Sequence, residues 1–188
     1  HARGGVTLAS RVLLFRRRGL VGLGRGLGRH RYLLGREGQR QPLACRRDAW
    51  PPGGGLPASD LDFMREQLLD LYGIEHGVMN PLSPSGQGNQ NDELSAAMAF
   101  ATNEYQLENW NRREPRLKAS VVVPYEDAEA SVKEIRLRAG DPRFAHVLFL
   151  SRTSELLGKK RYWPIFEAAV ESGRPVGVHV FGSSGRPM

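Results

Sequence analysis

The residue with the clearest chemical potential is His179, which closes the run Pro175-Val-Gly-Val-His179 near the end of the chain. An amphipathic segment at residues 161–172 and a glycine turn precede this run. The sequence therefore predicts a helix followed by a short buried strand that ends at the histidine. In a barrel of alternating strands and helices, catalytic residues lie at the carboxyl-terminal ends of strands. An imidazole at that position is a candidate metal ligand.

Two other side chains follow predicted strands. Arg152 comes just after the apolar run at residues 144–150, where its guanidinium could pair with a substrate carboxylate. A solvated loop arginine fits that position equally well. Asn80 precedes Pro81 at the end of another apolar run, and we expect it to form a turn.

Four more candidates are expected to serve the structure. His76 and His146 fall in the middle of predicted strands, where an imidazole satisfied within the sheet is the expected arrangement. Tyr162 and Trp163 stand at the start of the helix at 161–172, and we expect them to pack there. His179 thus remains the main candidate ligand.

The elements around these residues alternate along the chain. Apolar runs predict strands, and 3.6-residue periodicity predicts the helices between them. The expected strands are residues 74–80, 119–123, 144–150 and 175–181, and the expected helices are 59–73, 92–112, 126–139 and 161–172. This spacing is typical of βαβ units with right-handed crossovers, which form a parallel α/β sheet.

The helix faces can be assigned from the same periodicity. The first helix should begin at Ser59, with Asp62 completing a capping arrangement. The helix at 92–112 should bury a seam of four residues, Leu94, Met98, Ala101 and Tyr105. The helix at 126–139 should turn Ala130, Ile135 and Leu137 inward.

Two parallel architectures are compatible with this rhythm. A doubly wound sheet would show a Gly-x-Gly-x-x-Gly turn between its first strand and helix, and none is present. A complete (β/α)8 barrel needs about 250 residues, whereas residues 48–188 number 141. The pattern favours an incomplete (β/α)8 TIM-type barrel of about four βα units.

Residues 1–47 differ sharply in composition from the rest of the chain. They hold twelve arginines, nine glycines and a single acid, Glu37, whereas residues 48–188 hold fifteen basic and nineteen acidic residues. Gly and Arg interrupt the apolar runs, so we expect a segment that is disordered or non-native, such as a reading frame translated out of phase. A nucleic-acid-binding arm and an organellar presequence are the alternatives.

Cysteine content and hydropathy suggest a location. Cys45 is the only cysteine, which excludes an internal disulfide framework and fits a reducing compartment. No apolar run approaches the roughly 18 residues needed to span a membrane. We therefore expect a cytoplasmic protein that does not associate with membranes.

The folded part of the chain resembles the amidohydrolase-related family, in the branch that includes aminocarboxymuconate-semialdehyde decarboxylase. The resemblance covers residues 48–188 and is carried by four motifs and by the closing Gly173-Arg-Pro-Val-Gly-Val-His179. The motifs are Asp48-Ala-Trp-Pro-Pro, Ser59-Asp-Leu-Asp-Phe-Met-Arg-Glu-Gln-Leu-Leu-Asp, Gly77-Val-Met-Asn-Pro and Arg161-Tyr-Trp-Pro-Ile-Phe-Glu-Ala-Ala.

The resemblance implies a barrel with a divalent metal, usually Zn, at the carboxyl-terminal ends of its strands. The family takes two ligands from a His-x-His pair on the first strand, one from a fifth-strand histidine and one from a last-strand aspartate. Only His179 matches this set, as the fifth-strand ligand. No His-x-His pair occurs, and His30 stands alone. We therefore expect this chain by itself to be inactive.

The resemblance implies a metal-dependent hydrolase or decarboxylase, in which metal-activated water attacks a carbonyl or an unsaturated carboxylate. The substrate would be a small-molecule carboxylate or carbonyl compound. A non-catalytic α/β scaffold and a nucleic-acid-associated protein acting through its Arg/Gly arm are the alternatives, the nucleic-acid role being the weaker. An exposed half barrel should also self-associate as a homo-oligomer.

Overall fold

The computed structural model describes residues 9–16, 19–21, 47–55, 57–83, 85–88 and 91–179. The strands of these residues form one sheet in the order β2-β1-β3-β4-β5-β6. The last four strands are parallel and adjacent in sequence order, which confirms the predicted arrangement. They are β3 (His76–Ser83), β4 (Leu117–Val122), β5 (Phe144–Leu150) and β6 (Val176–His179).

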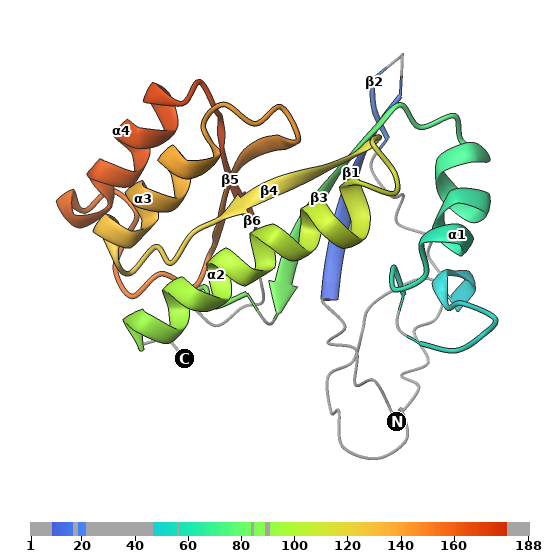
Figure 1. Ribbon diagram of the computed structural model, residues 1–188, viewed down its shortest axis with the longest axis horizontal. Coiled ribbons are helices and arrows are strands. Elements are labelled where there is room, and N and C mark those ends of the chain that lie inside the picture. The colour runs from blue at the N-terminus through green and yellow to red at the C-terminus, as the bar shows by residue number, and fades with distance from the viewer. Residues whose placement is uncertain are drawn as a thin grey trace.

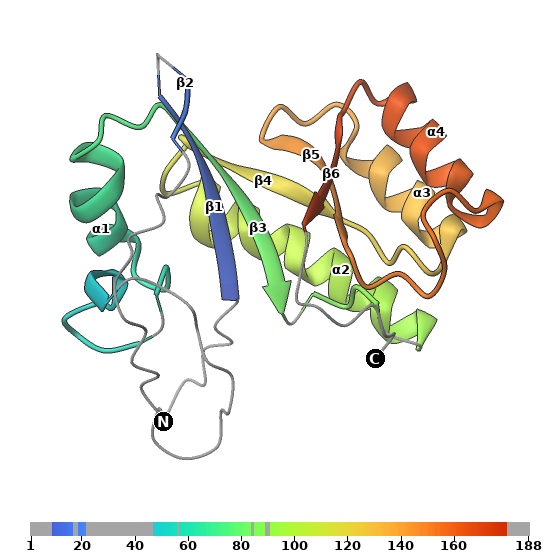
Figure 2. The same ribbon diagram turned by 180° about the vertical axis from the view of Figure 1, so that it is seen from behind.

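Helices connect these strands and surround the outside of the curled sheet (Figures 1 and 2). Before β3 come η1 (Arg47–Ala49), α1 (Leu61–Met64) and its continuation η2 (Arg65–Asp70). Between later strands lie α2 (Asp92–Gln106), η3 (Leu107–Asn111), α3 (Ala128–Arg138), η4 (Lys160–Tyr162) and α4 (Trp163–Glu171). The chain thus forms an α/β half barrel, and the predicted fold class is confirmed.

Two strands lie within residues 1–47, where the sequence predicted no run of strand length. β1 (Ala9–Arg16) pairs antiparallel with β3 over seven residue pairs, and β2 (Gly19–Val21) pairs antiparallel with β1. The prediction was wrong for these residues because it considered the segment alone. The edge of β3 supplies the backbone partners that a single strand lacks. The expectation of disorder for residues 1–8, 17–18 and 22–46 lies outside the described residues.

Side chains at the helix starts satisfy backbone N–H groups that have no partner within the helix. The first helix begins at Leu61, and the carboxylate of Asp60 accepts a hydrogen bond from Phe63 N at 3.0 Å. The predicted cap with Ser59 and Asp62 is therefore wrong, because the neighbouring aspartate takes the capping position. The side chains of Asp60, Asn91 and Asp127 cap α1, α2 and α3, whereas α4 has no side-chain cap.

Two amide side chains of α2 bond the backbone of β4. Asn103 accepts from the N–H of Val122 and donates to its carbonyl, both at 2.9 Å. Gln106 makes the same pair of bonds with Ser120, at 3.0 and 2.9 Å. β3 pairs with β4 only at the beginning of β4, at Leu117 and Lys118. The amides of α2 therefore take the place of a neighbouring strand along the rest of this edge.

This arrangement turns the buried face of α2 away from part of the predicted seam. The predicted seam is wrong at Leu94, which is 48% exposed, and at Ala101, which is also exposed. The buried residues of α2 are instead mostly polar: Ser95, Ala99, Thr102, Asn103 and Gln106. In α3, Ile135 is buried as predicted, whereas Leu137 is 60% exposed. Apolar periodicity failed in α2 because that helix covers a strand edge rather than an apolar sheet face.

The main core lies between β4, β5 and the helices that follow them. Odd-numbered residues of both strands point into it, including Val121, Val147 and Phe149, each fully buried. An aromatic stack joins the layers, with Tyr125 and Phe149 ring centroids 5.3 Å apart and Phe149 and Phe166 centroids 5.5 Å apart. The intervening residues Ser120, Val122, His146 and Leu148 face the inside of the curl instead.

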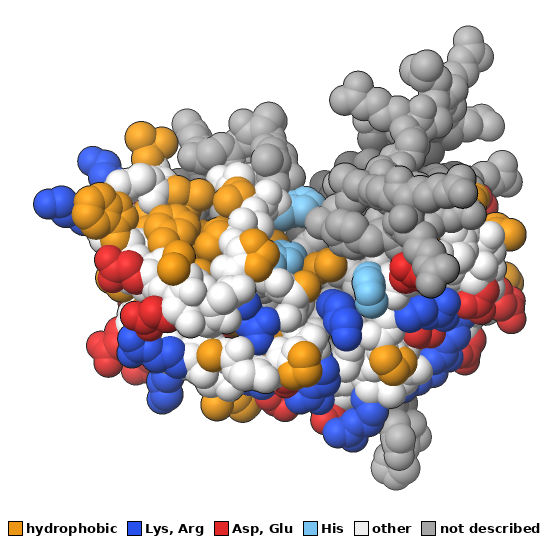
Figure 3. Space-filling model, turned by 90° about the horizontal axis from the view of Figure 1, so that it is seen from above, with side chains coloured by type: hydrophobic (Ala, Val, Ile, Leu, Met, Phe, Trp, Pro, Cys, Tyr) orange, Lys and Arg blue, Asp and Glu red, His pale blue; other side chains and the backbone are white. Residues whose placement is uncertain are grey.

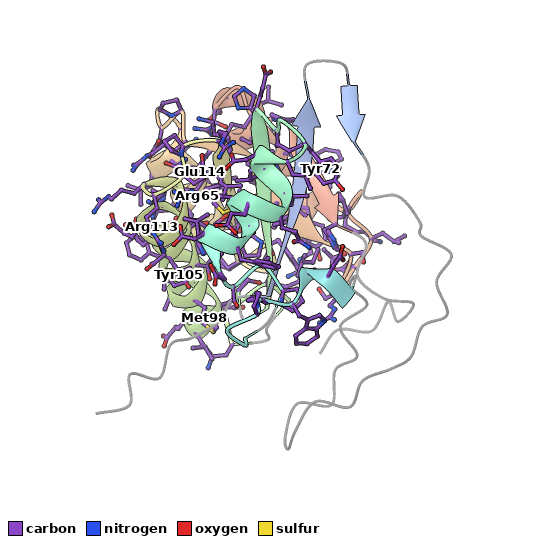
Figure 4. The ribbon with its side chains drawn as sticks, turned by 90° about the vertical axis from the view of Figure 1, so that its right-hand side faces the viewer. Arg65, Tyr72, Met98, Tyr105, Arg113 and Glu114 are labelled. Atoms are coloured by element: carbon purple, nitrogen blue, oxygen red, sulfur yellow. The ribbon has the colours of Figure 1, made fainter. Side chains whose placement is uncertain are left out.

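A charged cluster joins α1 and η2 to the chain just before β4 (Figure 4). The carboxylate of Glu114 accepts from Arg65 Nε at 3.0 Å and from Arg116 Nε at 2.8 Å. Its side chain is only 8% exposed. The hydrogen bond from Arg116, followed by that from Arg65, lowers the pKa of Glu114 from 4.5 to about 2 against the opposing effect of burial.

Replacing Gln106 by methionine should destabilise the fold by about 2–4 kcal/mol, because the buried N–H and C=O of Ser120 would both lose their partner. Urea unfolding followed by circular dichroism would measure this loss. The exposed amide Asn109 offers a control, since Asn109→Met removes only one bond to a helix carbonyl. Equal effects of the two substitutions would contradict the role assigned to Gln106.

The Glu114 cluster should make stability sensitive to acid. Because the folded-state pKa lies below the unfolded value, this stabilisation is present above pH 4.5 and is lost as pH falls toward 2. Urea unfolding across this range should show a smaller decrease for Glu114→Gln than for the unmodified chain. Glu108→Gln, at an exposed ion pair with Arg112, should leave the decrease unchanged. If the free energy of unfolding fell equally with pH in Glu114→Gln and in the unmodified chain, Glu114 would not contribute to the acid sensitivity.

Candidate functional site

The described strand ends meet at one edge of the sheet, because β3 to β6 are parallel. His179 is the last residue of β6 and lies beside Leu150, the last residue of β5. Its carbonyl accepts a hydrogen bond from Ser151 N at 3.1 Å. The side chain of His179 is half-buried. The histidine is therefore at the carboxyl-terminal edge, where barrel enzymes place their reactive groups.

Strand alternation places His179 on the inner face of the curl. Gly177, two residues earlier, shares its face, and a Cβ at Gly177 would lie 2.7 Å from Cδ2 of the His146 ring. His146 is an even-numbered residue of β5 and also points inward. Two neighbouring parallel strands, β5 and β6, thus contribute inward-facing positions to the same side of the sheet.

Arg152 lies two residues beyond β5 and is half-buried. Gly88, in the segment after β3, lies close to both Arg152 and Tyr125, and Tyr125 follows β4. A Cβ at Gly88 would lie 2.9 Å from Tyr125 Oη and 3.4 Å from the carbonyl oxygen of Arg152. The N–H of Ser151 donates to the His179 carbonyl, so the segment that carries Arg152 is bonded to the end of β6 at the carboxyl-terminal edge.

Asn80 is not the predicted turn residue, because β3 continues through Pro81 to Ser83. It is buried beside Ser120, whose hydroxyl lies 3.2 Å from Asn80 Oδ1 and 3.4 Å from Nε2 of His146. The Ser120 hydroxyl also donates to the Met79 carbonyl. Burial lowers the pKa of His146 from 6.5 to about 4, so its ring is neutral at pH 7. The cluster forms a polar layer inside the curl.

The remaining sequence candidates lie elsewhere. His76 begins β3 and is exposed, at the opposite end of the strands from His179. Tyr162 is fully buried, and its hydroxyl donates to Glu126 Oε2 at 3.1 Å, which holds the loops after β4 and β5 together. Trp163 is half-exposed and donates to the Gly158 carbonyl. His30 and Cys45 fall outside the described residues.

Sequence reasoning missed the group formed by Gln87, Gly88 and Tyr125. Gln87 Nε2 donates to the Leu148 carbonyl at 2.5 Å and to the Val123 carbonyl at 3.4 Å, which fastens its segment to the ends of β4 and β5. The position of Tyr125 directly after a predicted strand was the only signal available in the sequence.

Imidazole side chains reach the surface seen in Figure 3, close to one another near its centre. Among the described residues, however, no group of three or more His, Cys, Asp or Glu side chains is placed to hold a metal ion. His179 is thus one candidate ligand, and a complete metal site is not assembled by this part of the chain. No helix within the described ranges is long and apolar enough to cross a membrane.

Parallel strands that curl into half a barrel with helices outside define the fold class as that of the (β/α)8 barrels. The chain belongs to the amidohydrolase family, whose model matches residues 23–188. The match confirms the family resemblance, although it begins earlier than the residues that carried it. No curated protein sequence matches the chain.

Solved structures support the same fold. The 5-carboxyvanillate decarboxylase LigW2 from Novosphingobium aromaticivorans, solved with manganese and 3-methoxy-4-hydroxy-5-nitrobenzoic acid, is 25% identical with a TM-score of 0.55. The match covers 61% of this chain and 33% of that one. The 2,6-dihydroxybenzoate decarboxylase from Rhizobium is 21% identical with a TM-score of 0.57, covering 64% and 39%. This chain therefore matches well under half the length of either enzyme.

The contact between Gly177 and His146 can be tested by a double-mutant cycle. Gly177→Ala should destabilise the fold by about 1–3 kcal/mol, because the added methyl group overlaps the imidazole. In the His146→Ala background the same substitution should cost little, since the ring is gone. Thermal unfolding of the four proteins would give the coupling. An equal cost in both backgrounds would show that the two residues do not interact.

Proposed function

We propose that this chain is part of a metal-dependent decarboxylase of the amidohydrolase family that acts on small organic acids. The observation that carries the proposal is His179, an inward-facing residue at the carboxyl-terminal end of β6 in a parallel half barrel. Two similar solved structures are decarboxylases of aromatic acids, which supports a carboxylate substrate. Hydrolysis at a carbonyl is the alternative reaction within the same family.

The residues present meet only part of what a metal site requires. An imidazole suits zinc and manganese alike, so His179 has the right chemistry. A catalytic site takes three or more protein ligands, and the described residues contribute no such group. The described part of the chain therefore does not fit a complete metal site. We infer that the other ligands come from outside the described residues.

The chemistry of the ligands also bears on which metal ion the site would hold. The family resemblance indicated zinc, whereas the LigW2 structure contains manganese. Both ions accept histidine and carboxylate ligands, and selectivity depends on the full ligand set and its geometry. We propose a divalent cation, with manganese and zinc as the two ions to compare.

Metal titration of this chain tests the ligand assignment. A single imidazole competes poorly with hydration, so calorimetry should give zinc and manganese dissociation constants on the order of millimolar or weaker. The same titration with His179→Ala should show still weaker binding, and His76→Ala, an exposed histidine at the other end of the strands, should behave like the unmodified chain. Submicromolar stoichiometric zinc that disappears in His179→Ala would contradict the single-ligand assignment.

The sequence of the encoding DNA tests whether this chain is part of a longer enzyme. A His-x-His motif in another frame before residue 48 and further βα units after Met188 would establish a longer enzyme. That longer protein, supplied with manganese, should release carbon dioxide from 2,6-dihydroxybenzoate or 5-carboxyvanillate, and His179→Ala should reduce the rate at least about 100-fold. Full activity in His179→Ala would refute the proposal.

A further inference from the structure

The outward face of α4 carries apolar side chains where a surface helix is usually polar. Ile165, Ala168 and Ala169 pack into the core. On the other face of the helix, Val170 is 79% exposed and Trp163 is 48% exposed. Figure 3 shows hydrophobic side chains gathered on the side of the molecule where α4 lies. A helix that is apolar on both faces is normally covered on both of them.

The two exposed residues form one surface, which we call the Trp163–Val170 face. They are seven positions apart in the helix, which is about two turns, so they lie on the same side roughly 10 Å apart along the axis. A large ring at one end and a small branched side chain at the other fit the same pair turned end for end. Contiguous exposed apolar surfaces commonly mark sites of protein interaction.

The charges along α4 run against its helix dipole. Lys159, Lys160 and Arg161 stand directly before the helix, whereas Glu167 and Glu171 lie in its second half. The dipole favours acidic side chains at the start of a helix and basic side chains at its end. α4 has no acidic residue in its first turn and no basic residue in its last. A second helix lying antiparallel would correct this, because each basic end would then lie beside an acidic end.

The charged residues also border the apolar surface. Lys160 Nζ lies 5.9 Å from the centroid of the Trp163 ring, so one cation stands at the edge of the face. Glu171, at the other end of the helix, is exposed and forms an ion pair with Arg136 at 3.2 Å. Ion pairs between exposed side chains are weak and exchange readily, so Glu171 remains able to meet a second cation.

We propose that a second copy of this chain docks on the Trp163–Val170 face, with the two α4 helices antiparallel about a two-fold axis. Such an axis places the same surface on both sides of the contact, so that surface must be complementary to itself. Trp163 then packs on the partner's Val170, and Lys160 approaches the partner's Glu171. This inference does not depend on the proposed function, because it concerns the outside of the half barrel.

Sedimentation velocity of the 188-residue chain over a series of concentrations tests the contact. One helix face buries a small area, so monomer and dimer should exchange with a dissociation constant on the order of 10 μM. Val170→Asp places an unpaired carboxylate in the contact and should raise that constant at least about tenfold. The matched control is Leu94→Asp on α2, because Leu94 is as exposed as Trp163. It should leave the constant unchanged.

A charge swap tests the antiparallel arrangement. Lys160→Glu and Glu171→Lys should each weaken the dimer by about threefold to tenfold, because each brings like charges together. The double variant should restore the affinity. Within one copy the two positions lie on the order of 16 Å apart along the helix, so restoration reports on a contact between copies.

Three results would overturn the proposal. The first is a chain that stays monomeric at every concentration, with the face covered by the same molecule. The second is association that persists unchanged in Val170→Asp and in both charge variants, which would place it elsewhere, such as the outer edge of β6, the last strand of the described sheet. If circular dichroism showed Val170→Asp to be unfolded, failure of the double charge variant to restore the affinity would overturn the proposal instead.

Discussion

The curl of the sheet depends on how β4 satisfies its backbone where β3 moves away from it. An unpaired central strand would leave buried N–H and C=O groups without partners, which is among the costliest defects a protein core can contain. Asn103 and Gln106 remove that defect by presenting amides with the same donor and acceptor pattern as a peptide group. The helix that carries them can therefore occupy the gap between the two strands.

The buried amide of Asn103 needs polar neighbours in addition to the backbone of β4. Asn103 Nδ2 donates to Glu134 Oε1 at 2.8 Å, and Glu134 in turn forms an ion pair with Arg138 at 2.9 Å. Arg138 is nearly buried and reaches Glu104 of α2 as well. Asn103, which bonds the backbone of β4, is therefore also part of a polar network between α2 and α3. Such networks are stable only when their members are satisfied together.

The sequence was most informative where one face of an element is uniformly apolar. The bounds of β5 were predicted without error, since Phe144 to Leu150 is an uninterrupted apolar run apart from His146. The position of His179 at a strand end followed from the glycine turn and the short apolar run before it. These features depend on local pattern alone, so one sequence is enough to read them.

The sequence was least informative where a tertiary neighbour decides the outcome. The polar buried face of α2 looks like a solvated face until β4 is placed beside it. β1 looks like an interrupted Arg/Gly segment until β3 offers an edge. Tyr125 could be placed after a strand, but its contact with Gly88 exists only once the segment after β3 has folded against it. No complete metal site could be assembled from the residues that the structure describes.

The unequal pairing of β3 has a mechanical consequence. β3 shares seven residue pairs with β1 but only two with β4, so the backbone ladder is thinnest in the interior of the sheet rather than at its rim. Proteins open in cooperative units that separate where few hydrogen bonds cross. Amide exchange should therefore divide this chain along the β3–β4 seam, with the β1–β3 antiparallel ribbon and the β4–β6 segment opening as separate units.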